Sequence, residues 1–257
     1  MRIAACIALL TAVASTALAA EIPQAERRSG YSFMSPDTKA MQDEDTANPG
    51  MLFVLDGEAL WQRKAGTANK ACADCHSDAR ISMKGVAAHY PAFEKALGKP
   101  VDLEARINLC RTNHQQASPF AYESHELLAL TAYVAQQSRG MPIATGDDPK
   151  LAPFVEKGHA LFMQRQGQLN LGCTNCHDDS WDKKLAGSAI TQGQPTGYPL
   201  YRLEWQSLGS LQRRLRACIT GIRAQAYDYG KPELVELELY LMTRARGMPV
   251  ETPAVRP

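Results

Sequence analysis

Cys72-Ala-Asp-Cys75-His76 and Cys173-Thr-Asn-Cys176-His177 repeat one pattern, CxxCH, 101 residues apart. CxxCH is the attachment pattern of a c-type haem. Two thiols three positions apart can both reach the vinyl groups of one porphyrin, and the adjacent imidazole then ligates the iron. The sequence therefore predicts two covalently bound c-type haems, each held by the two cysteines of one motif and ligated by its histidine.

The flanks of the two motifs also repeat. Gly57-Glu-Ala-Leu60-Trp61 begins fifteen residues before Cys72, and Gly158-His-Ala-Leu161-Phe162 begins fifteen residues before Cys173. Downstream, Ile107-Asn-Leu-Cys110-Arg-Thr112 resembles Leu215-Arg-Ala-Cys218-Ile-Thr220, and Ser138-Arg-Gly-Met-Pro142 resembles Ala245-Arg-Gly-Met-Pro249. Such an internal repeat indicates a duplication. Each half has its own haem motif, its own later cysteine and its own closing helix.

The coarse secondary structure is helical. Apolar residues recur at helical spacing after Ser124, a favoured cap residue, and again after Pro232, which suits the first turn of a helix. We expect an all-α fold of two tandem cytochrome c-like domains related by duplication. Turn formers at 146–149 separate the halves, so the predicted domains are residues 51–146 and 147–257, preceded by a polar N-terminal extension at residues 21–50.

Residues 1–20 are typical of a secretory signal peptide, because Arg2 precedes the apolar run Ile3–Val13 and Ala17-Leu18-Ala19 matches a cleavage site. The run is too short for a transmembrane anchor, which needs about 20 apolar residues. The sequence thus predicts export to the periplasm and no membrane span. The full chain has 28 Lys and Arg against 27 Asp and Glu. This balance argues against binding to nucleic acid through its phosphates.

Two thiols remain after haem attachment, Cys110 and Cys218. They could form a disulfide, but equivalent residues of two domains each belong beside their own haem. They could instead be the sixth iron ligands, a role for which Met141 and Met248 also compete because an axial methionine is common in cytochromes c. Spacing leaves both residue types open. An unpaired thiol in an oxidising compartment needs a binding partner, which favours cysteine.

With two CxxCH motifs, each followed by a single cysteine, and with Arg214-Leu-Arg-Ala-Cys218, the chain resembles the SoxA family. Members of this family are the dihaem subunits of SoxAX cytochromes, also called L-cysteine S-thiosulfotransferases. The resemblance covers essentially the whole mature chain. It implies that thiosulfate is joined oxidatively to a cysteine of a SoxYZ-like carrier, with two electrons passing through haem to a SoxX-like monohaem partner in a heterodimer. It also implies His76 with Cys110 and His177 with Cys218 as iron ligands, Cys218 as catalytic persulfide and Arg214 as substrate-binding residue.

The residues themselves support part of this resemblance. Arg214 and Cys218 are four apart in a predicted helix and so share one face. A guanidinium there would lower the pKa of the thiol and could bind a sulfonate. Arg106 precedes Cys110 by the same spacing, however, so the spacing could also serve a haem propionate. Additional positive charge on Arg213, Arg216 and Arg223 distinguishes the second site.

Two other functions are compatible with the motifs. One is a pure electron-transfer dihaem cytochrome, in which the arginines form a docking patch. The other is a dihaem peroxidase, which would need an iron position open to peroxide.

Overall fold

The computed structural model describes residues 22–257, so the predicted signal peptide, residues 1–20, lies outside the described residues. The longer helices are α1 (Pro36–Asp43), α2 (Gly50–Gln62), α5 (Leu103–Cys110), α6 (His125–Gln136), α7 (Ala152–Met163), α9 (Leu211–Gly221) and α10 (Pro232–Arg244). Single turns form α3 (Ala73–His76), α4 (Ala79–Ser82) and α8 (Cys173–His177). There are 3₁₀ turns at η1 (Gln24–Glu26), η2 (Gly30–Phe33), η3 (Val86–His89) and η5 (Pro149–Leu151), and a π-helical turn at η4 (Arg111–Gln115). The strands are β1 (Ala92–Glu94), β2 (Lys99–Val101), β3 (Lys184–Leu185), β4 (Ser188–Ala189), β5 (Leu200–Arg202), β6 (Ser207–Gly209) and β7 (Ala254–Arg256).

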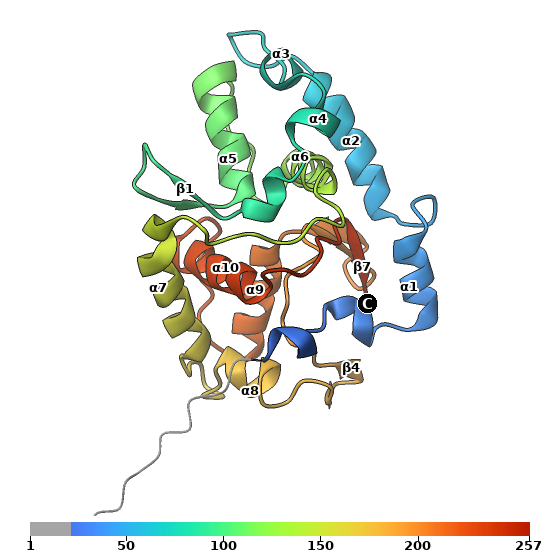
Figure 1. The fold of residues 1–257 in the computed structure, drawn as a ribbon, viewed down its shortest axis with the longest axis vertical. Coiled ribbons are helices and arrows are strands. Elements are labelled where there is room, and N and C mark those ends of the chain that lie inside the picture. Colours follow the sequence, from blue (N-terminus) through green and yellow to red (C-terminus); the bar gives the residue numbers. More distant parts are fainter. Residues whose placement is uncertain (1–21) are drawn as a thin grey trace, which may run out of the picture.

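Figure 1 shows the two halves side by side, with α2 to α6 in one and α7 to α10 in the other. The order of elements repeats: α2, α3, α5 and α6 in the first half correspond to α7, α8, α9 and α10 in the second. The predicted helical fold and its duplication are confirmed. The predicted division between residues 146 and 147 falls in the loop before η5 and remains a prediction.

One helix pair forms the framework of each half, α2 with α6 and α7 with α10. The repeated glycine of the sequence lies where the two helices touch. A Cβ at Gly57 would lie 2.1 Å from the carbonyl oxygen of Ala129, and one at Gly158 would lie 2.0 Å from that of Glu236. Both positions therefore need glycine, because any side chain would push the paired helices apart.

The closing helices begin and end near the predicted residues. The Ser124 hydroxyl accepts a hydrogen bond from the backbone N–H of Leu127, and Gly140 and Gly247 adopt left-handed conformations in the turns beyond α6 and α10. These two turns pair with each other, with Pro142 opposite Pro249 in an antiparallel bridge. Because each turn binds its own equivalent, the halves are related by an approximate twofold axis.

The short strands were not predicted, and they position the later cysteines. The β1–β2 hairpin leads into α5 and the β5–β6 hairpin leads into α9. In the second half β7 adds to β5 in parallel, and α1 of the N-terminal extension packs on β7. The side-chain amide of Asn48 also donates to the carbonyl of Pro253 at 2.9 Å. The N-terminal extension thus packs on the second half.

Candidate functional site

Each CxxCH motif forms a single helical turn, α3 or α8. The side chain just before the second cysteine stabilises the start of this turn. Asp74 accepts a hydrogen bond from the backbone N–H of Ala71 at 2.8 Å, and Asn175 accepts one from that of Gly172 at 3.0 Å. Because cysteines three positions apart lie on one face of a helical turn, both thiols of each motif point to the same side.

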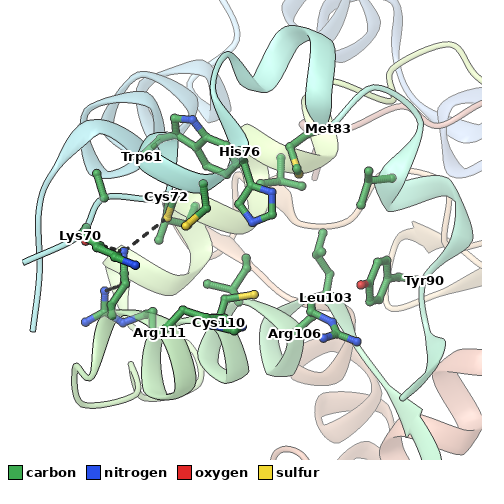
Figure 2. A pocket seen from close by; sticks show the side chains of 18 residues that line it. Trp61, Lys70, Cys72, His76, Met83, Tyr90, Leu103, Arg106, Cys110 and Arg111 are labelled. Carbon is green, nitrogen blue, oxygen red and sulfur yellow. Dashed lines mark hydrogen bonds between the residues drawn. The ribbon is translucent and has the colours of Figure 1, made fainter. Parts of the chain in front are cut away.

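The first motif opens onto a cavity. Figure 2 shows the His76 ring and the Cys110 side chain on opposite sides of it, with the first carried by α3 and the second at the end of α5. The cavity encloses about 180 Å³ and is open to solvent on one side. Its walls are mostly apolar, as a porphyrin requires, and include Trp61, Leu103, Ile107, Leu130 and Val134. The donor set and the apolar walls fit a c-type haem.

The second motif presents the same pair of donors. The Nδ1 of His177 lies 2.7 Å from the carbonyl oxygen of Thr191. A carbonyl can only accept, so Nδ1 carries the proton and Nε2 is left with a lone pair for a metal. The same imidazole lies close enough to Cys218 to affect the pKa of its thiol. The second site therefore also fits an iron held between an imidazole and a thiolate.

The two later thiols differ in electrostatics. Burial raises the pKa of Cys110 despite the charge of Arg106. Burial also acts to raise the pKa of Cys218, but the interaction with His177 and the positive charges of Arg214 and Arg202 outweigh it, so this pKa is lowered. Of the two, Cys218 is the thiol whose surroundings favour the reactive thiolate.

The candidate sixth ligands, methionine and cysteine, lie in different surroundings. The methionines at 141 and 248 belong to the paired turns between the halves, where Ile143 donates to the carbonyl of Met248 at 2.9 Å. Met141 is not part of the cavity wall, whereas Cys110 is. Both later cysteines are free thiols, so the alternative of a disulfide between them is not realised.

The two equivalent arginines have different partners. Arg106 forms an ion pair with Glu94 on β1. Among the described residues Arg214 has no carboxylate within ion-pair distance, and its charge acts on Cys218 instead. The predicted pair of Arg214 and Cys218 is thus brought together, and its positive charge remains available.

The additional charge at the second site comes from a residue that the sequence analysis missed. Arg213 is 3.8 Å from Glu123 and Arg216 is 3.9 Å from Asp228, while Arg223 is exposed. These three arginines have no basic counterparts in the first half, as expected, but two of them have acidic partners of their own. Arg202, at the end of β5, supplies the charge. Extending the repeat back to Tyr90-Pro91 and Tyr198-Pro199 would have revealed it.

The SoxA/TsdA cytochrome c domain family matches residues 56–143 and 157–250. The L-cysteine S-thiosulfotransferase subunit SoxA of Rhodovulum sulfidophilum is 39% identical over 90% of this chain and 80% of its own length. The chain belongs to the SoxA family of cytochromes c. A second SoxA relative, from Pseudaminobacter salicylatoxidans, is 39% identical over 91% of this chain and 82% of its own.

The fold of this SoxA-family chain is shared with a solved structure. The crystal structure of SoxXA from P. pantotrophus matches with a TM-score of 0.87 at 31% identity, over 90% of this chain and 87% of that one. Each matched family segment contains one CxxCH motif and one later cysteine, and c-type haem is the cofactor of such domains. Within residues 22–257 no helix is long and apolar enough to cross a membrane.

Proposed function

We propose that this chain is the subunit of an L-cysteine S-thiosulfotransferase that joins thiosulfate to a cysteine of a SoxYZ-like carrier. Its two covalent haems would be held by Cys72 and Cys75 and by Cys173 and Cys176. The iron ligands would be His76 with Cys110 and His177 with Cys218. When bound, the haems supply one-electron redox centres.

The proposed reaction forms one sulfur–sulfur bond. The carrier thiol loses its proton, the outer sulfur of thiosulfate bonds to the carrier sulfur, and a thiosulfonate-modified cysteine results. Each turnover releases one proton and two electrons, which leave in two one-electron steps to a SoxX-like monohaem cytochrome bound as the heterodimer partner. The signal peptide predicted from the sequence supports a periplasmic location for the reaction.

The observation that carries the proposal is the uncompensated charge of Arg214 beside Cys218. A guanidinium without a carboxylate partner can bind the sulfonate of thiosulfate by charge-assisted hydrogen bonds. The lowered pKa of Cys218 favours an ionised sulfur at the same place, and Cys218 is the proposed catalytic residue. A pure electron carrier needs neither feature.

The test uses the purified holoprotein with its partner cytochrome, the carrier and thiosulfate. Intact mass spectrometry of the carrier should show the gain of one thiosulfate, and that of the holoprotein should show two haems. Cys218→Ser should abolish the carrier adduct, whereas Cys110→Ser, which changes the equivalent ligand, should retain it. Absence of the carrier adduct with the wild-type holoprotein would favour a pure electron-transfer cytochrome, and equal adduct formation in both variants would exclude the catalytic role of Cys218.

A further inference from the structure

In each half a segment leads from a Tyr-Pro pair to the later cysteine, and the two segments have the same length. Tyr90 precedes Cys110 by twenty residues, and Tyr198 precedes Cys218 by twenty. In each segment a two-stranded hairpin leads into the helix that carries the cysteine, β1, β2 and α5 in the first half and β5, β6 and α9 in the second. The two segments align without a gap, so every residue of one segment has a defined counterpart in the other.

At one position of this alignment the two halves have side chains of opposite charge. Glu94 is the last residue of β1 and Arg202 is the last residue of β5. In the first half Glu94 neutralises Arg106. In the second half Arg202 faces Arg214, and the repulsion between the two guanidiniums adds to burial in lowering the pKa of Arg202. A carboxylate–guanidinium pair in one half is thus replaced by two cations in the other.

The only carboxylate paired with either cation within the described residues is a largely exposed one, so their charge is only partly neutralised. The Nη2 of Arg202 contacts Glu204 at 2.9 Å, but the side chain of Glu204 is 66% exposed. The Arg202 Nε is buried, and no hydrogen-bond partner for it lies within the described part of the chain. Both charges act on the Cys218 thiol. Like charges held together at a half-buried site create a strong attraction for an anion with two negative charges.

We propose that Arg202 and Arg214 together bind the sulfonate end of thiosulfate, so that Arg202 is a second substrate-binding residue. This inference rests on the proposed function and extends it, because it identifies what makes the second site selective for a small dianion. Glu94 at the equivalent position of the first half would repel the same anion. The charge reversal therefore also explains why only one of two otherwise equivalent Arg–Cys pairs would act on substrate.

The other anionic group that Arg202 and Arg214 could bind is a propionate of the second haem. Both halves would carry the same haem, however, and a residue that serves propionates should have the same charge in both. The charge reversal between Glu94 and Arg202 favours the substrate, and the experiment distinguishes the two.

The experiment measures thiosulfate binding to the oxidised holoprotein by calorimetry without carrier, and kcat and KM for thiosulfate with carrier. Arg202→Gln should weaken binding and raise KM by roughly tenfold or more, the effect of losing one charge-assisted hydrogen bond. Arg202→Glu recreates the ion pair of the first half, so it should fold and weaken binding further, and Arg202→Lys should restore part of the loss. Arg246→Gln, which removes a second-half arginine that pairs with Asp147, should leave binding unchanged.

Each alternative has its own result. Equal binding by the Arg202→Gln and Arg246→Gln variants, with wild-type adduct formation intact, would overturn only the role of Arg202. A changed haem spectrum or potential in Arg202→Gln with unchanged thiosulfate binding would assign Arg202 to a propionate and overturn the inference. A wild-type holoprotein that neither binds thiosulfate nor modifies the carrier would overturn the proposed function itself.

Discussion

Glu104 is a buried acid between the two halves and makes the stability of the protein depend on pH. Its carboxyl is 8% exposed and borders the same inter-half cavity as Glu238 of α10. Burial, with added repulsion from Asp102, raises the pKa of Glu104 from its ordinary value of 4.5 to about 8. The native state therefore keeps this proton over a range in which the unfolded chain has released it.

The sign follows from proton binding. Between pH 4.5 and 8 the native state binds more protons than the unfolded state, so the free energy of unfolding falls as the pH rises. Each pH unit costs about 1.4 kcal/mol, which amounts to at most about 4 kcal/mol between pH 5 and 8. Glu104→Gln removes the contribution of Glu104, whereas Asp102 and Glu238, whose pKa values burial also raises, keep theirs. The pH dependence should therefore become weaker, and the variant should match the wild type near pH 5 and exceed its stability at pH 8.

The assay is guanidinium unfolding of the holoprotein at pH 5, 6.5 and 8, followed by far-ultraviolet circular dichroism. Glu58→Gln, which removes an exposed carboxylate of α2, is the control for the loss of one negative charge and should leave the pH dependence as in the wild type. If Glu104→Gln and the wild type keep the same difference in stability at all three pH values, the reasoning about the buried proton is wrong.

Three further predictions concern the haem sites and the arginines. Replacing Cys72 and Cys75 with Ala should remove one haem by mass while the second half keeps its own; a wild-type protein with a single haem would contradict this. Cys110→Met should raise the reduction potential of the first haem, because a neutral thioether favours ferrous iron more than a thiolate does. If Cys110→Ala has the same electron paramagnetic resonance spectrum as the wild type, Cys110 is not an iron ligand. Arg214→Ala should slow turnover roughly tenfold to a hundredfold. Arg106→Ala loses the pairing with Glu94 in the half without the proposed substrate site, so it should keep turnover nearly intact in the same steady-state assay. Equal losses would assign both arginines a structural role.

Local rules account for what could be predicted from the sequence. The two CxxCH motifs, the cap at Ser124 and the glycines of the closing turns act over a few residues, so their residue types alone indicate structure. Because the sequence is duplicated, each local feature of one half predicts an equivalent feature in the other. That is why the helical fold, the two equivalent halves and the association of Arg214 with Cys218 could be expected before the structure was seen.

The tertiary structure decided which side chains meet across long stretches of chain. The turns around Met141 and Met248 bind each other rather than facing the cavity, because the halves pack about a twofold axis that no single-chain pattern reveals. Arg202 and Glu94 lie twelve residues from the arginines that they face, on strands too short to produce a periodic signal. Since electrostatic interactions depend on distance in space and on burial, the charge that surrounds each cysteine could only be assigned once the hairpins and helices were in place.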